Sequence, residues 1–229
     1  MAWDEQLLDW QIAQGGQDWI LRFYDWHPSA LSIGYHQRFV PPTWLELVAE
    51  LQLDLVRRPS GGRAVLHSGS LTYALICPQM YSSRWAMYDY LCQFLCLGMS
   101  RLGIDLTFGA GKDYAHADSC FHSHTRGDLI MANGQKLIGN AQLYKQGSVL
   151  QHGTIMICPH REWLQRFFGD GRSIGAIADL AQFAQQTLPE IQQSLIRALT
   201  QSAEQHFLVE FKRTEFSQLV PCLISPKPA

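Results

Sequence analysis

Hydrophobic positions recur along the chain at two periods, which predicts helices interspersed with strands. Helical spacing predicts helices over residues 3–14, 41–51, 84–102, 161–168 and 188–207. Alternating or short apolar runs predict strands over residues 19–24, 31–34, 56–58, 64–67, 71–77, 106–108, 128–132, 136–142, 149–158 and 208–212. Because strands and helices do not alternate strictly, we expect an α+β fold with a mixed, largely antiparallel sheet and flanking helices.

Two pairs of these strands are separated by turn residues and predict hairpins. Asn133-Gly134 joins one pair, and this dipeptide favours the left-handed backbone of a tight turn. Ser68-Gly69-Ser70 joins strands 64–67 and 71–77. No repeat or low-complexity linker divides the chain. We therefore expect a single domain over residues 1–229, with a small C-terminal helix-and-strand portion at about 186–215.

Composition and charge narrow the classes of protein. The 229 residues are 47% hydrophobic and 17% charged, as in globular proteins. A formal charge of −2 gives no electrostatic case for a nucleic-acid partner. The N-terminus lacks the pattern of a signal peptide, and no stretch is apolar enough for a membrane span. The six cysteines form no CxxC pair. We expect a soluble cytoplasmic protein without membrane association or a disulfide framework, with Cys92 and Cys96 as core residues.

A glycine turn between arginines is the first candidate for chemistry, in the stretch RRPSGGRAVLH over residues 57–67. Paired glycines let backbone N–H groups approach an anion or a carbonyl closely, and arginines add charged donors. The stretch is not a P-loop. The pattern alone favours a plain turn with solvated arginines.

Lys136 and a cysteine–histidine loop are the other candidates. Lys136, after the Asn-Gly turn, could contact an acyl carbonyl or a phosphate, but the pattern alone favours an edge-strand charge. Cys120 lies among His116, His122 and His124. That cluster could hold a nucleophilic thiolate, a zinc ion or a free cysteine, and its spacing matches no standard zinc site.

Taken together, the ordered motifs resemble the lipoate protein ligase and octanoyltransferase family of the lipoate–biotin protein ligase superfamily. The matching stretches run from the first helix through RRPSGGRAVLH, LTYALI, SCF and GQKLIGNAQLYKQGSVLQHGTIMI. The resemblance implies a catalytic domain with a fold like that of biotin ligases and class II aminoacyl-tRNA synthetases. It also implies transfer of lipoic or octanoic acid to a lysine of a lipoyl carrier domain, belonging to the glycine-cleavage H protein or a dehydrogenase E2.

The resemblance assigns the site residues as well. Lys136 matches the family lysine at the acyl carbonyl, and Cys120 matches the thioester-forming cysteine of the cysteine-dependent octanoyltransferases. The substrate-binding residues implied are Arg58, Ser60, Gly61, Gly62, Arg63, Ala64, His67, Gly139, Asn140, Ala141, Gln142 and His152.

Two mechanisms exist within this family. ATP-dependent lipoate ligases form an acyl-adenylate with ATP and Mg, and commonly show three glycines where this chain has Gly61-Gly62-Arg63. GGRAVLH with LTY and SCF is more similar to octanoyltransferases that take octanoate from acyl carrier protein, without ATP or a metal. An ATP-dependent lipoate ligase and a non-catalytic acyl- or carrier-binding relative are the alternatives.

Overall fold

The structure, a computed structural model, describes residues 1–109, 125, 127–169 and 173–214. The helices are α1 (Ala2–Ala13), α2 (Pro42–Glu50), α3 (Arg84–Ser100), α4 (Arg161–Phe168) and α5 (Leu188–Phe207). The strands are β1 (Ile20–Tyr24), β2 (Ala30–Ile33), β3 (Asp54–Arg57), β4 (Val65–His67), β5 (Ser70–Pro78), β6 (Leu106–Phe108), β7 (Leu129–Met131), β8 (Lys136–Lys145) and β9 (Ser148–Met156). Each of the five predicted helices is confirmed to within two residues at either end.

The strands form two sheets. A six-stranded sheet has the order β1-β5-β9-β8-β7-β6, and all its pairs are antiparallel. A three-stranded sheet has the order β3-β2-β4, in which β2 and β3 run parallel and β2 and β4 antiparallel. The predicted α+β fold with a mixed, largely antiparallel sheet is confirmed.

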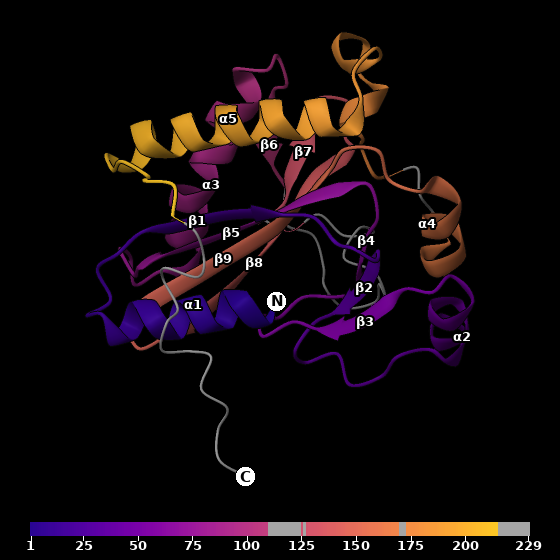
Figure 1. Cartoon of the computed structure of the whole chain (residues 1–229), viewed down its shortest axis with the longest axis horizontal. Helices are drawn as coiled ribbons and strands as arrows, with labels where there is room; N and C mark the ends of the chain where they lie inside the picture. Colours follow the sequence, from indigo (N-terminus) through magenta and orange to yellow (C-terminus); the bar gives the residue numbers. More distant parts are fainter. Residues whose placement is uncertain (110–124, 126, 170–172, 215–229) are drawn as a thin grey trace.

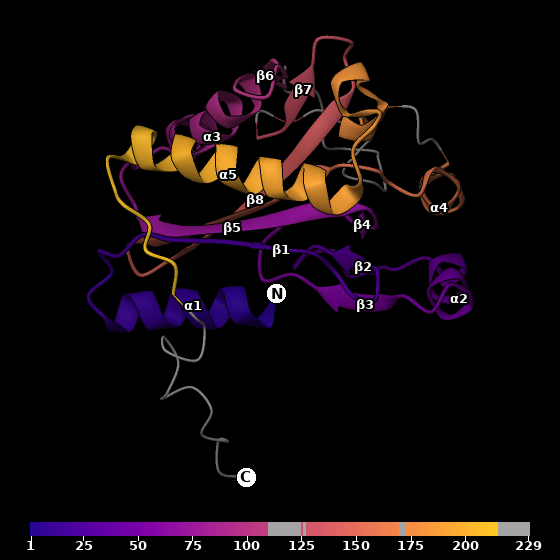
Figure 2. The same cartoon turned by 45° about the horizontal axis from the view of Figure 1, so that its top comes forward.

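Helices cover both faces of the larger sheet (Figures 1 and 2). On one face α3 and α5 pack together, and the close approach needs Gly98, where a Cβ atom would lie 2.6 Å from the side chain of Leu199. On the other face α1 buries Leu7 and Leu8 against sheet residues that include Ile76 and Leu150. The central strands β5 and β9 are therefore buried on both sides, and β9 is buried along its whole length.

The predicted hairpin over 64–77 is wrong, because β4 and β5 belong to different sheets. The chain turns a corner at Gly69, which has a left-handed φ of 60°. Its carbonyl accepts hydrogen bonds from the N–H groups of Ile157 and Cys158, and a Cβ atom there would lie 1.9 Å from the Cys158 carbonyl oxygen. Contact with the end of β9, far away in sequence, thus decides the geometry of this turn.

The predicted hairpin at Asn133-Gly134 is confirmed, since β7 and β8 pair antiparallel. Only Gly134 takes the left-handed backbone, at φ 82°. Its N–H donates to the Met131 carbonyl at 2.9 Å, while the Asn133 side chain accepts from the N–H of Gln135 at 3.0 Å. The asparagine thus stabilises the turn through its side chain.

The predicted strand over 208–212 is wrong, since residues 208–214 contain no strand. After α5 the chain leaves the helix through Leu208, which has a left-handed φ of 57°. The N–H of Phe211 then donates to the carboxylate of Glu204 at 3.1 Å. A side chain of the preceding helix takes the hydrogen bond that a neighbouring strand would have provided.

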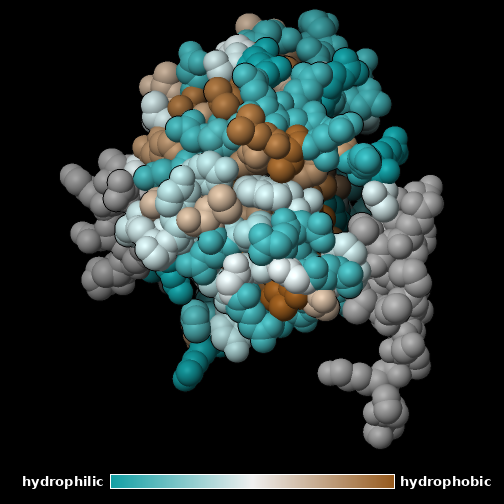
Figure 3. Space-filling view, turned by 90° about the vertical axis from the view of Figure 1, so that its left-hand side faces the viewer, coloured by the Kyte–Doolittle hydropathy of each residue, from teal (hydrophilic) through white to brown (hydrophobic). Residues whose placement is uncertain are grey.

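On one face of the molecule the hydrophobic side chains are separated by hydrophilic ones (Figure 3). Figure 3 shows one face that is largely hydrophilic, with separate hydrophobic patches. Over the part of the chain that is described, none of the helices combines the length and the hydropathy needed to cross a membrane.

Candidate functional site

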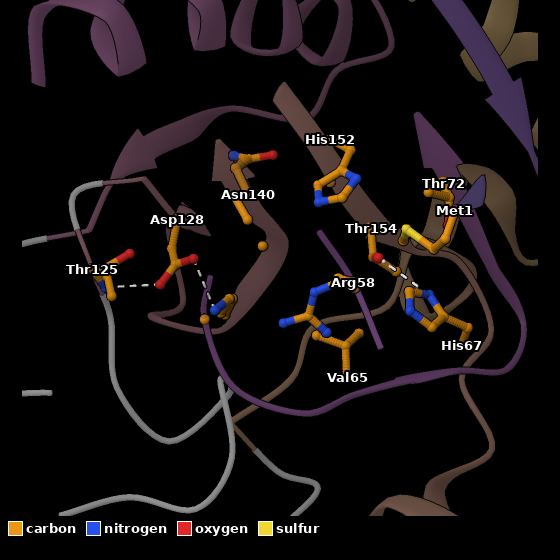
Figure 4. A pocket seen from close by; sticks show the side chains of 15 residues that line it. Met1, Arg58, Val65, His67, Thr72, Thr125, Asp128, Asn140, His152 and Thr154 are labelled. Atoms are coloured by element: carbon orange, nitrogen blue, oxygen red, sulfur yellow. Dashed lines mark hydrogen bonds and ion pairs between the residues drawn. The ribbon is translucent and has the colours of Figure 1, made fainter. Parts of the chain in front are cut away.

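Eight of the predicted site residues line one pocket between the two sheets (Figure 4). Its empty volume is about 600 Å³, counting the open mouth. The lining comes from the loop after β3, from β4 and β5, and from the paired strands β8 and β9. The lining residues are Met1, Arg58, Gly62, Val65, His67, Thr72, Thr125, Asp128, Lys136, Gly139, Asn140, Ala141, His152, Gly153 and Thr154.

Lys136 is a buried cation in the wall of this pocket. It opens β8 and is 1% exposed, so the edge-strand interpretation is wrong. Its backbone bonds to Ser173 and Gly175, and its Nζ atom lies 2.9 Å from Oδ1 of Asp128. Gly139 gives the side chain room, since a Cβ atom there would lie 3.1 Å from Lys136 Cε. Packing and the ion pair therefore hold the ammonium in one place.

Asp128 is a site residue that the sequence reasoning missed. It is 2% exposed, and its second carboxylate oxygen accepts the N–H of Thr125 at 2.7 Å. Each oxygen of this carboxylate therefore has a partner, one a cation and the other an N–H group. Its position beside the glycine- and histidine-rich stretch made it look like the start of an ordinary strand. The signal that could have identified it is an acidic residue directly before the first strand of the Asn-Gly hairpin, whose second strand begins at Lys136.

Arg58 organises the glycine turn from inside. Its guanidinium is 4% exposed and donates to the Ser32 carbonyl at 2.9 Å and to the Arg63 carbonyl at 2.6 Å. The turn also packs closely on β2, because a Cβ atom on Gly34 would lie 1.8 Å from the Gly62 carbonyl oxygen. The plain solvated-turn interpretation is therefore wrong for Arg58.

Two buried histidines flank this turn. His67 has one ring nitrogen 2.7 Å from Ser32 Oγ and the other 3.3 Å from Thr154 Oγ1. Burial lowers the pKa of His67 well below its ordinary value, and the charge of Arg58 adds to the effect. His152 is hydrogen-bonded through Nε2 to Ser60, and burial lowers its pKa too. Both rings are therefore neutral near pH 7.

Asn140 is oriented by a buried chain of polar side chains. Its Oδ1 accepts from the Tyr73 hydroxyl at 2.7 Å, and its Nδ2 donates to the Gly127 carbonyl at 2.6 Å. Gln151 donates to the same Tyr73 hydroxyl at 2.8 Å, and Gln142 donates to Gln151 at 2.7 Å. This network fixes the residue next to Asp128 and so contributes to the position of the Lys136 partner.

The described thiols are packed as core groups or lie away from the pocket. Cys92 is fully buried, and burial raises its pKa, so it stays a thiol. Burial also raises the pKa of Cys96, to about 11. The expectation of a core residue is confirmed for Cys92, while Cys96 is half-buried and packs against the core. The four cysteines in the described part, including Cys77 and Cys158, are free.

The structure brings together most of the predicted residues. A second, open groove adjoins the pocket, shares Arg58, Gly62, Asn140 and Ala141 with it, and is also lined by Ser60, Gly61 and Gln142. Within the described residues, the linings of these two cavities do not include Arg63 or Ala64. Ala64 is fully buried in the core, and the Arg63 carbonyl accepts a hydrogen bond from Arg58.

Cys120 and the histidines His116, His122 and His124 lie outside the described residues. The predictions of a nucleophile or a zinc site there stay predictions. Across residues 1–109, 127–169 and 173–214 no three histidine, cysteine or acidic side chains gather as a metal-binding group.

The arrangement is suited to acyl transfer. A buried ammonium held by one carboxylate can stabilise negative charge that develops on a carbonyl oxygen. Small residues, Gly139, Ala141 and Gly153, leave space beside it. Water-poor surroundings strengthen the electrostatic effect of the ammonium, since the local dielectric is low.

Sequence comparison finds a matching family model and curated relatives. The family model described as the lipoyl protein ligase A/B catalytic domain matches residues 1–206. A curated relative from Lysinibacillus sphaericus, named octanoyltransferase LipM, is 38% identical over 180 residues, covering 73% of this chain and 64% of the relative. One from Bacillus subtilis with the same name is 34% identical over 169 residues, covering 69% and 60%. The chain thus spans less than two thirds of the length of these relatives.

Solved structures share the fold at low sequence identity. A lipoate-protein ligase A bound with ATP superposes with a TM-score of 0.73 at 20% identity, over 90% of this chain and 82% of that one. A putative lipoate protein ligase from T. acidophilum with bound lipoic acid gives 0.73 at 20% identity, over 90% and 81%. The pocket described above therefore lies in a fold shared with lipoate ligases.

Proposed function

The chain belongs to the lipoyl protein ligase A/B catalytic domain family, and from that premise we propose that it is an octanoyltransferase of protein lipoylation. It takes an octanoyl group from the thioester of acyl carrier protein and passes it to the lysine of a lipoyl carrier domain, in the glycine-cleavage H protein or a dehydrogenase E2. The names of the curated relatives support this activity. The single structural observation that carries the proposal is the buried Lys136 ammonium held by Asp128 at the pocket wall.

The proposed reaction has two acyl-transfer steps. The Cys120 thiolate attacks the octanoyl carbonyl, and the thiolate of the carrier protein leaves. The amine of the acceptor lysine then attacks the enzyme thioester, and the Cys120 thiolate leaves. In both steps the Lys136 ammonium offsets the negative charge on the carbonyl oxygen. The role of Cys120 rests on the resemblance of the SCF stretch. A thioester is already activated, so this scheme needs neither ATP nor a metal.

Intact mass after incubation with octanoyl carrier protein tests the proposal. We expect an octanoyl adduct that hydroxylamine removes and that Cys120→Ala abolishes. Cys158→Ala is the matched control, because Cys158 is an exposed thiol away from the pocket lining. Octanoyl transfer to a lipoyl domain at the wild-type rate by Cys120→Ala would overturn the thioester mechanism.

The same assay separates the alternatives. With ATP, Mg and lipoate, lipoate-dependent pyrophosphate exchange would replace the proposal with an ATP-dependent ligase. Binding of octanoyl or lipoyl compounds without turnover would indicate a non-catalytic relative. Arg63 and the stretch LTY at residues 71–73, which differ from the ligase pattern, favour the octanoyltransferase.

A further inference from the structure

Three buried side chains in contact with one another connect α1 to the glycine turn beside the pocket. Ser60, His152 and Asp4 are 1%, 3% and 0% exposed. The Ser60 hydroxyl is hydrogen-bonded to His152 Nε2. His152 Nδ1 lies 3.7 Å from Asp4 Oδ2, which is longer than a hydrogen bond but close enough for an ion pair once the ring is protonated. The three groups come from a loop, from the middle of β9 and from the first turn of α1.

The surroundings of Asp4 keep it ionised. Its carboxylate accepts a hydrogen bond from Arg22 at 2.6 Å and one from the Tyr24 hydroxyl at 2.7 Å. Burial opposes ionisation, but His152, the amino group of Met1 at 4.0 Å and Tyr24 outweigh it, and the pKa of Asp4 is lowered. An anion beside Nδ1 favours the imidazole tautomer with its proton on Nδ1. The lone pair of Nε2 then faces the Ser60 hydroxyl, which donates to it.

The other charged groups around His152 keep the ring ready to accept a proton. Burial lowers the pKa of His152, Asp4 works against that lowering and Arg58 adds to it. His67, the other buried histidine, is itself neutral near pH 7. The ring of His152 is therefore neutral at pH 7, while Asp4 is in place to stabilise it when it becomes charged.

The three linked side chains reach the pocket in which the acyl transfer is proposed to occur. His152 lines the same pocket as Lys136 and Asn140, and it pairs across β8 and β9 with Ala141 (Figure 4). Ser60 lines the adjoining open groove. The serine thus stands between the neutral histidine and the space that an incoming amine can enter. His67 differs, because its two ring nitrogens face the hydroxyls of Ser32 and Thr154 instead of a carboxylate.

We propose that Ser60, His152 and Asp4 form a proton relay for the second half of the acyl-transfer reaction. The inference rests on the proposed function. As the neutral acceptor amine attacks, a C–N bond forms, the C–S bond breaks and the thiolate leaves. The nitrogen passes a proton to Ser60 Oγ while the Ser60 proton moves to His152 Nε2. The imidazolium next to Asp4 later releases its proton to water. Acylation of the cysteine exchanges one thiolate for another and needs no such relay.

The two half-reactions can be measured separately. The octanoyl-enzyme is formed with octanoyl carrier protein, isolated, and mixed with a lipoyl domain in single-turnover experiments from pH 4.5 to 9. His152→Gln keeps an acceptor for the Ser60 hydroxyl but cannot take a proton at these pH values. We expect it to slow transfer by about 10²–10⁴-fold, the usual contribution of a general base, and to slow acylation much less. Ser60→Ala should act in the same direction.

The matched control is His206→Gln on α5, a partly buried histidine whose Nε2 bonds to the Tyr90 carbonyl far from the pocket. It should leave both rates unchanged. Asp4→Asn is the second variant, and it keeps the shape of the side chain. Without the anion the pKa of His152 falls further, so the acid limb of the transfer rate should move to lower pH while the plateau drops. A purely structural role would not move that limb.

The outcomes distinguish the relay from the proposed function. If the wild-type chain forms no octanoyl-enzyme, the proposed function fails and the relay fails with it. If the octanoyl-enzyme forms and folded His152→Gln transfers its acyl group at the wild-type rate, the relay alone is overturned. Equal slowing of both half-reactions with an unchanged pH limb in Asp4→Asn would also overturn it.

Discussion

Replacing Asp128 by asparagine tests whether the burial of its ion pair with Lys136 makes the pair important for stability and for acyl transfer. The pair joins Nζ and Oδ1 at 2.9 Å, with side chains only 2% and 4% exposed. At an effective dielectric constant of about 20, two unit charges at that distance attract by about 6 kcal/mol. An asparagine has one acceptor oxygen where the carboxylate has two. It therefore fails to serve Lys136 and the Thr125 N–H together, and the ammonium loses its counter-charge.

We expect Asp128→Asn to lower the free energy of unfolding by about 3–5 kcal/mol, the usual cost of removing one partner of a buried pair. Chemical denaturation gives this number. Octanoyl transfer should fall by about 10²-fold or more, since the donor for the carbonyl oxygen is no longer held in place.

Asp9→Asn is the matched control. It makes the same chemical change in another Asp–Lys pair, with Lys145, which has a shorter separation of 2.5 Å but side chains 49% and 42% exposed. Exposed pairs contribute about 0.2–1 kcal/mol. If both variants lose the same stability, burial is not the deciding factor and the reasoning is refuted. A double-mutant cycle with Lys136→Met measures the coupling directly.

Three further outcomes follow from the site. Gly34→Ala places a Cβ atom 1.8 Å from the Gly62 carbonyl oxygen and should lower the free energy of unfolding by about 1–3 kcal/mol, measured with denaturant. Gly61→Ala is the control, because a Cβ atom there meets open space. An equal loss in both variants would contradict the steric argument. Burial, and after it the charge of Arg58, lowers the pKa of His67, so folding favours the neutral ring. The free energy of unfolding that this contributes is present above about pH 6.5 and is lost as the pH falls, by up to about 1.4 kcal/mol per pH unit. His67→Gln should flatten that pH dependence, and an unchanged slope would exclude His67 as its source. Tyr73→Phe removes the hydroxyl that is hydrogen-bonded to the side chains of Asn140 and Gln151, and it should lower the free energy of unfolding by about 1–3 kcal/mol. An unchanged free energy of unfolding would instead show that water replaces the hydroxyl.

Local patterns predicted the elements better than their partners. The helices follow from apolar spacing and turn residues, as for Thr187, whose capping box with Glu190 begins α5. Both predicted hairpins have turn residues between their strands, yet only the one at Gly134 exists. At Gly69 hydrogen bonds from Ile157 and Cys158 hold the turn, and no residue near Gly69 in sequence encodes those contacts.

The ordered motifs placed Lys136, His152 and Asn140 in one site, because a family resemblance carries spatial information that local spacing lacks. By itself the sequence determined the elements, the α+β class and the family. Only the tertiary structure decided the environment of each charge. Asp128 became the partner of Lys136 and Asp4 the neighbour of His152 because strand pairing and the packing of α1 on the sheet buried them there. The burial of Asp128 and Asp4 and their distances to Lys136 and His152 depend on residues far apart in the sequence, so local sequence patterns did not identify these acids as site residues.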